Sequence, residues 1–119
     1  MAEEKYVYPE LRRQRAVDEH EAEHGEEEHA EGNQALLDVL EADDTSTEDF
    51  DDFVEELAKL VNHHLTEEEL TILNPARDDL STEARATLGE AFLRARNKLI
   101  ESDCGTLDQV RTHVATAQK

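Results

Sequence analysis

The amino-acid sequence predicts an all-α protein that folds as an antiparallel helical bundle. Glycine and proline are scarce, with four and two residues among 119, and there is no run of β-branched residues. Apolar residues recur instead at steps of three, four and seven, most clearly between Phe50 and Ile72. These steps are typical of one face of an amphipathic helix. A chain of this length is enough for one small domain with a modest core.

The first two helical segments differ in how clearly the sequence marks them. Residues 1–13 have the character of the end of a helix, which we expect Pro9 to stop, because proline lacks an N–H and its ring clashes with the preceding turn. A second helical pattern runs from about residue 14 to residue 42. Its apolar side is clear only near the end, between Leu36 and Leu40.

The third helix begins after a loop of capping residues at positions 42–47. Ser46 or Thr47 is its expected N-cap, because a serine or threonine hydroxyl can accept a hydrogen bond from the first turn. This helix carries the clearest apolar stripe of the chain. We expect it to end before Pro75.

The C-terminal part of the chain contains one more long helix and a short one. Ser81 is the expected N-cap of the long helix. Thr106 and Gln109 have the spacing of a capping box, which predicts a short polar helix after them. We therefore expect a helical domain over residues 1–102 and a polar C-terminal tail with a short helix over residues 103–119.

The composition excludes several classes of function. The formal net charge is −19, with 31 acidic and 12 basic residues, which argues against binding to nucleic acid. It is compatible with cation binding or with adaptation to high salt. The single cysteine, Cys104, excludes an internal disulfide and fits a reducing cytoplasm. Neither a signal peptide nor a membrane span is evident, so we expect a soluble cytoplasmic protein that binds no membrane.

Two polar residues lie in line with the apolar stripe of the third helix. His64 follows Leu57 by seven residues, and Glu68 follows His64 by four, so both should point inward. A buried carboxylate needs a hydrogen bond, a counter-charge or a metal. Inward histidine and glutamate side chains are a common metal site in helical bundles, and they suit iron, manganese or zinc. The alternative is a core histidine that is hydrogen-bonded to Glu68.

A second group of histidines lies in the stretch HEAEHGEEEHAEG. His29 precedes Leu36 by seven residues and continues its face, whereas His24 lies five residues before His29. Five residues correspond to roughly 140° around a helix, so His20, His24 and His29 can share one site only if a bulge near Gly25 shifts the register. We expect His29 to be a ligand, His24 to be a weaker candidate and His20 to be solvated.

No catalytic motif is recognisable elsewhere in the chain. The acidic runs lack the glycine and the alternating pattern of an EF-hand loop. The chain contains neither a glycine-rich phosphate-binding loop nor a supported Ser/His/Asp arrangement. His113 lies off every apolar stripe, and we assign it no role. We therefore expect a protein that is not an enzyme.

Three stretches, taken in order, resemble the hemerythrin-like family of HHE cation-binding domains. They are EEKYVYPELR, EEEHAEGNQALLDVLEA, and LVNHHLTEEELTILNPAR followed by LSTEARATLGEAFLRAR. The likeness covers roughly residues 2–100. It implies a four-helix, up-and-down bundle that binds non-haem iron, as a single ion or a pair, through histidine and carboxylate side chains. It also implies a role in handling dioxygen, nitric oxide or iron.

The resemblance also implies a set of metal ligands in this chain. Matched by position, these are Glu3, His29, His64 and Glu68. Glu4 is the alternative to Glu3, because the alignment can shift by one residue. Gly25 stands four residues before His29, where members of the family with two histidines on this helix carry the second one.

The chain departs from the family pattern at its start. The family's first helix supplies a histidine, and its second helix supplies another four residues before the position of Glu3, but this sequence begins at Met1. The resemblance therefore implies an N-terminally truncated bundle with an incomplete metal site. Either a preceding segment is missing, or the chain pairs with a second copy as a homodimer. The alternative function is a metal-free helical module for interaction or dimerisation.

Overall fold

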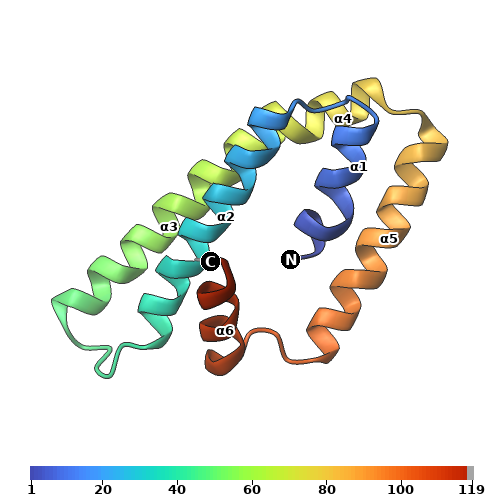
Figure 1. Ribbon diagram of the computed structural model, residues 1–119. Helices are drawn as coiled ribbons and strands as arrows, with labels where there is room; N and C mark the ends of the chain where they lie inside the picture. Colours follow the sequence, from blue (N-terminus) through green and yellow to red (C-terminus); the bar gives the residue numbers. More distant parts are fainter. Residues whose placement is uncertain (118–119) are drawn as a thin grey trace.

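A computed structural model describes residues 1–117, which form helices joined by short turns and contain no strand. The predicted all-α fold class is confirmed. Figure 1 shows α2 (Glu19–Leu40) and α3 (Glu48–Glu68) side by side, while α5 (Thr82–Glu101) stands apart from α3, with α1 (Tyr8–Arg13) between the two sides. The molecule is elongated, with extents of 50 × 28 × 25 Å. None of its described helices is both long enough and apolar enough to cross a membrane.

The first helical segment continues past its proline. A π-helical turn, η1 (Glu3–Val7), leads directly into α1, and Pro9 lies in the first turn of α1. The expectation that Pro9 stops the helix was wrong, because the first turn of an α-helix does not need the N–H that proline lacks. The helix ends at Arg13, and Arg15 adopts a left-handed conformation with φ of 56° in the turn that follows.

The second helix begins later than the sequence pattern indicates. It starts at Glu19 rather than near residue 14, and its N-cap is Asp18. The Asp18 carboxylate accepts a hydrogen bond of 2.9 Å from the backbone N–H of Glu21. A carboxylate at this position also interacts favourably with the positive end of the helix dipole.

The third helix also continues through its proline, contrary to expectation. A second π-helical turn, η2 (Glu69–Leu73), follows α3 and leads into α4 (Asn74–Asp79), with Pro75 in the first turn of α4. The two predicted caps are confirmed. The side chain of Thr47 accepts a hydrogen bond in the first turn of α3, and that of Ser81 does so in the first turn of α5.

The main apolar core lies where η1, α1, α2 and η2 meet. Tyr8, Leu11, Ala22 and Ile72 are each only 1% exposed there. This core holds the N-terminal segment against the pair formed by α2 and α3. It therefore fixes the position of the acidic residues of η1 relative to the histidines of those two helices.

A smaller core fastens the C-terminal helix, α6 (Leu107–Ala117), to α2. It consists of Leu37 from α2 with Val110 and Val114 from α6, and Figure 1 shows α6 beside the end of α2. The domain boundary at residue 102 stays a prediction. The last two residues of the predicted tail, 118 and 119, lie outside the described residues.

The apolar stripe of α3 is largely uncovered. No apolar residue of α3 is buried, and Glu68 is its one buried residue. Leu65 is 57% exposed, and Leu93 and Ile100 on α5 are each 54% exposed. Phe53, Val54 and Val61 on α3 are also exposed. We call these side chains of α3 and α5 the open apolar faces.

Candidate metal centre

Two neighbouring helices bring three of the predicted ligands together. His29 from α2 and His64 and Glu68 from α3 each offer a donor atom, and these atoms all lie within 4.8 Å of one another. The two imidazole rings meet edge to face, with centroids 4.4 Å apart. The side chain of Glu68 is only 9% exposed, so the inward direction expected for His64 and Glu68 agrees with the structure.

The π-helical turn η1 brings two consecutive carboxylates to the two nitrogens of His29. An oxygen of Glu3 lies 3.1 Å from Nε2, and an oxygen of Glu4 lies 2.6 Å from Nδ1. The sequence left Glu3 and Glu4 as alternatives, whereas in the structure both contact His29, on different nitrogens. Glu3 thus contacts Nε2 of His29. In the other imidazole, His64, the same nitrogen faces the carboxylate of Glu68.

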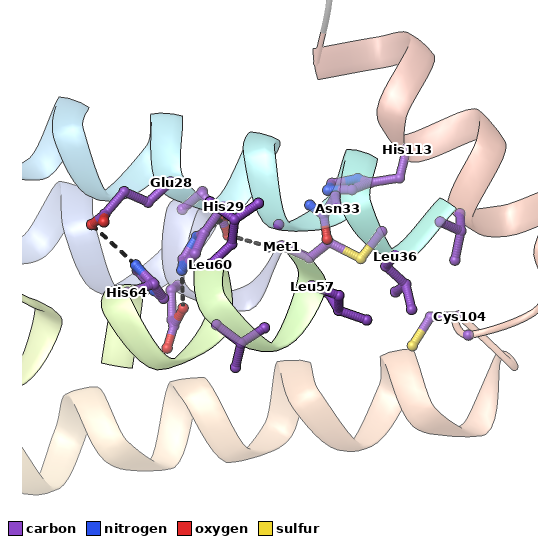
Figure 2. Close-up of a pocket in the computed structure, with 16 residues that line it drawn as sticks. Met1, Glu28, His29, Asn33, Leu36, Leu57, Leu60, His64, Cys104 and His113 are labelled. Carbon is purple, nitrogen blue, oxygen red and sulfur yellow. Dashed lines mark hydrogen bonds and ion pairs between the residues drawn. The ribbon is translucent and has the colours of Figure 1, made fainter. Parts of the chain in front are cut away.

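His64 is held in the same manner as His29. Its Nδ1 lies 3.3 Å from Oε1 of Glu28, and its Nε2 lies 3.4 Å from Oε2 of Glu68. Figure 2 shows Glu28 and His64 joined in this way, with His29 beside them. Histidines that ligate metals commonly have one ring nitrogen fixed by a carboxylate, which orients the ring and raises its basicity. Glu4 and Glu28 are in position to do this for His29 and His64.

Glu28 is the buried carboxylate beside the centre that the sequence analysis missed. It is only 8% exposed, although it lies in an acidic run that reads as a solvated helix face. One signal was available, because Glu28 lies seven residues before Ala35, which is also buried. The remaining information is tertiary, since the imidazole that holds Glu28 comes from a different helix.

The structure does not bring His24 into this centre. The side chain of His24 is 44% exposed, and its Nε2 lies 3.8 Å from Glu28, away from the three clustered donors. The role of His24 as a weaker ligand stays a prediction, although its side chain lies apart from the three donors. The reason is the five-residue step to His29, which turns the two side chains to different sides of α2. His20 is exposed, as expected, and stacks on the ring of His24.

Tyr8 closes the centre on the side of the main core. Its hydroxyl donates a hydrogen bond of 3.1 Å to Oε1 of Glu68, and its ring stacks near that of His29. A Cβ atom on Gly25 would lie 3.0 Å from the Tyr8 hydroxyl oxygen and 3.2 Å from Cδ1 of Ile72. Tyr8 thus takes the space that a side chain at position 25 would need.

The charges of the centre shift the protonation of its members. Burial lowers the pKa of His29, but the hydrogen bonds that its ring donates to the carboxylates of Glu3 and Glu4 outweigh burial and raise the pKa to about 9. Burial would raise the pKa of Glu4, yet its hydrogen bonds with His29 and the terminal amino group hold it well below its usual range. Burial and the charge of Glu3 raise the pKa of Glu68. Without a cation, His29 therefore carries a proton at neutral pH.

A cavity of about 560 Å³ adjoins the centre. Its wall is mainly apolar and includes Leu36 from α2 with Leu57 and Leu60 from α3. Figure 2 shows it extending from His64 and His29 toward Cys104 and His113. Apolar walls beside a donor cluster limit the entry of water and strengthen the electrostatic interactions inside it.

The donor set fits a metal ion. Nε2 of His64 is buried and makes no hydrogen bond within residues 1–117; its 3.4 Å contact with Oε2 of Glu68 is an ion pair only when the imidazole is protonated. A buried polar atom without a partner is costly, and a cation between His29, His64 and Glu68 would satisfy it. Imidazole with carboxylate suits iron, manganese or zinc.

These features define a helical protein with a histidine and carboxylate centre of the cation-binding kind. A family model described as the hemerythrin HHE cation binding domain matches residues 1–76. The match spans more than half of the chain and includes every residue of the centre, so the chain belongs to this family. The resemblance drawn from the sequence is confirmed, and with it the cation-binding class. No curated protein and no solved structure matches the chain significantly.

Proposed function

We propose that the cation of this hemerythrin HHE domain is iron, and that the protein handles dioxygen, nitric oxide or iron itself without catalysing a reaction. The observation that carries the proposal is the convergence of His29, His64 and Glu68 around Nε2 of His64, which makes no hydrogen bond in the described part of the chain. Glu3 supplies a further carboxylate at Nε2 of His29. These donors of one chain support one ion, and an iron pair requires additional ligands.

The protein's own residues prepare this site in three ways. Glu4 and Glu28 hold the imidazoles at Nδ1, so that Nε2 of each ring faces the donor cluster. Tyr8 fixes the rotamer of Glu68 by its hydrogen bond. The leucines of the neighbouring cavity give that side an apolar wall. Iron, when bound, would supply redox chemistry and an open coordination position for a small diatomic ligand.

The metal content of protein purified without oxygen, followed by its absorption spectrum in air, tests this proposal. We expect stoichiometric iron and a visible absorption band that changes on exposure to air. His64→Ala should lose most of the metal, because it removes a donor from the cluster. His20→Ala is the matched control, since His20 is an exposed histidine outside the centre, and it should retain the metal. Equal losses from both variants would reject the assignment.

The open apolar faces favour a second candidate function, a helical module that dimerises. The face of α3 is bordered by acidic residues such as Glu55 and Glu56, whereas α5 carries Arg94, Arg96 and Lys98. Apolar stripes flanked by opposite charge are complementary surfaces. We propose that α5 of one copy covers α3 of a second copy, and that the reciprocal contact forms a homodimer.

Sedimentation equilibrium of the metal-free and the metal-loaded protein separates the two functions. Dimerisation without metal supports the interaction module, and metal binding by a monomer supports the cation centre alone. Leu65→Glu places a charge on the α3 face, where the side chain is 57% exposed, and should abolish the dimer. A monomer at tens of micromolar would count against the homodimer.

The sequence supports a further proposal about location. A single cysteine, Cys104, fits a reducing compartment, and we propose that the protein works in the cytoplasm. Its net charge of −19 is unfavourable for contact with nucleic acid or with anionic lipid surfaces. Fractionation of cells that express the tagged full chain would test the location.

A further inference from the structure

A second set of metal-binding side chains lies on the outer side of α2 and α3, around Glu28. Nε2 of His63 lies 3.3 Å from Oε2 of Glu28, and Nε2 of His24 lies 3.8 Å from Oε1. The carboxylate is almost buried, with 8% of the side chain exposed, whereas His24 and His63 are 44% and 61% exposed. One desolvated acid is thus approached by two solvent-accessible imidazoles from different helices.

We propose that His24, Glu28 and His63 form a second cation site, the outer site, which takes a divalent transition metal of the zinc or cobalt type. His24 and Glu28 are four residues apart and share one face of α2, so that both can reach the same ion. His63 completes the set from α3. Two imidazoles and one carboxylate are a usual donor set for such ions, with water in the remaining position.

Three imidazoles surround the carboxylate of Glu28. His24, His63 and His64 all lie within 3.8 Å of this one carboxylate. Two of these imidazole nitrogens and the carboxylate oxygen together provide the ligand types that divalent transition metals use. Neutral imidazole nitrogen is the form that binds metals.

The surroundings of the outer site favour cations. Glu23, Glu26 and Glu27 belong to the same helical run of α2, and the whole chain is strongly acidic. Such a field raises the local concentration of divalent ions. Within residues 1–117, only His29, His64 and Glu68 have donor atoms that all lie within 4.8 Å of one another, so the exposed rings of His24 and His63 would have to move toward an ion held by Glu28.

The outer site is linked to the centre through Glu28. Oε1 of Glu28 contacts Nδ1 of His64. An ion at the outer site would therefore compete with His64 for the carboxylate that orients its ring. The outer site does not depend on the proposed function, because none of its three donors belongs to the cluster of His29, His64 and Glu68. Occupation of one site is therefore expected to change the affinity of the other.

Titration of the metal-free full chain with Co²⁺, followed by visible absorption and by equilibrium dialysis, tests the outer site. We expect two classes of bound Co²⁺ in the unmodified protein. His24→Asn and His63→Asn should each lose one class, and both changes are at exposed positions that leave the fold intact. His20→Asn is the control on the same helix: His20 stacks on His24 but makes no ion pair with Glu28, so this variant should keep both classes of Co²⁺.

A variant of the centre separates failure of this inference from failure of the proposed function. His29 makes no ion pair with Glu28, so His29→Asn should remove the inner class of Co²⁺ and keep the outer one. If only a class sensitive to His29→Asn is found, the outer site is overturned while the centre stands. If only a class sensitive to His24→Asn and His63→Asn is found, the outer site is supported and the centre fails. If neither His24→Asn nor His63→Asn changes the number of Co²⁺ ions bound per chain, the outer site is overturned.

Discussion

Leu65 and Ile72 lie seven residues apart on the same predicted apolar stripe, yet their environments are opposite. Ile72 is 1% exposed and packs in the main core, whereas Leu65 is 57% exposed. The helical path from α3 through η2 connects the two residues directly. Periodicity therefore showed which side chains share a face, but it did not show which part of that face is covered by another element.

The candidate centre lies at the boundary between these two regions. Glu68 is fixed from the side of the main core by the Tyr8 hydroxyl. On the other side, His64 adjoins a cavity whose wall includes Leu57 and Leu60. The comparison shows that the main core positions the candidate ligands. The cavity reaches them from the side where the apolar faces of the helices are open.

The largest expected effect comes from comparing Tyr8→Ala with Phe53→Ala. Tyr8 is 1% exposed and Phe53 is 38% exposed. Removing a buried aromatic ring costs about 3–5 kcal/mol, whereas an exposed position costs within about 0.5 kcal/mol. Urea unfolding at low protein concentration measures both. If a second copy covers α3, the loss of unfolding free energy caused by Phe53→Ala will grow with protein concentration, and the loss caused by Tyr8→Ala will not. Equal losses for the two variants at high dilution would contradict the distinction between the two regions.

A smaller effect is expected from adding a single methyl group at two glycines. Gly25→Ala brings a Cβ within 3.0 Å of the Tyr8 hydroxyl oxygen, while Gly89→Ala on α5 meets no atom within 4 Å. Overpacking of the core costs about 1–3 kcal/mol, and an exposed helical glycine replaced by alanine gains about 0.5–1 kcal/mol. Thermal unfolding should therefore move in opposite directions for the two variants. If Gly25→Ala instead stabilised the protein, the side chain of Tyr8 would be able to shift away from the added methyl group at little cost.

The pH dependence of the metal-free protein tests the packed side of the centre. The pKa of His29 is raised to about 9 by Glu3 and Glu4, above the ordinary value near 6.5. The resulting stabilisation is fully present below pH 6.5 and is lost as the pH rises through about 9. We expect the free energy of unfolding to fall by about 1–2 kcal/mol between pH 6 and pH 9.5.

Urea titrations in the presence of a chelator measure this change, and His29→Gln should remove most of it. An equal pH dependence in the variant would contradict the role of His29. The same proton must leave before His29 can bind a cation, so cation affinity should rise over the same pH range.

The smallest effect is expected at Leu93 on α5, where the side chain is 54% exposed. In the monomer, Leu93→Gln should change the free energy of unfolding by no more than about 0.5 kcal/mol. Chemical unfolding of the dilute protein measures it. A loss above about 1 kcal/mol under these conditions would mean that α5 packs on the rest of the chain more closely than the structure shows.

The parts of the fold that depend on local chemistry could be predicted from the sequence. Ser81 was recognised as a cap, and the cap of α3 was narrowed to Ser46 or Thr47, because an N-cap needs only a short side chain and the next turn of the same helix. His64 and Glu68 were placed on the inner face because their spacing is set within one helix. Asp18, with Glu21 three residues later, carries the same kind of signal and could have been recognised.

The prolines were misread because each follows a π-helical turn. The backbone N–H of Tyr8 donates to the carbonyl of Glu3, and that of Asn74 donates to the carbonyl of Glu69. These bonds reach five residues back, so the widened turn rearranges the hydrogen bonds just before Pro9 and Pro75, and the helix continues. Such turns follow from packing rather than from residue type.

The acidic partners of the histidines were only partly predictable. Glu3 entered through the family resemblance. Glu28 looked like any other glutamate in its run, and what distinguishes it is the position of His63 and His64 on another helix. A residue whose role is set by a neighbouring element leaves little trace in a single sequence.

The hydrogen bond between Tyr8 and Glu68 gives the protein an intrinsic optical reporter. The chain has two tyrosines and no tryptophan, so its ultraviolet fluorescence comes from Tyr6 and Tyr8 alone. Tyr6 is 39% exposed and can be quenched by soluble iodide, whereas Tyr8 is shielded and contacts a candidate ligand. The iodide-resistant emission would therefore follow occupancy of the centre in real time, with no label attached.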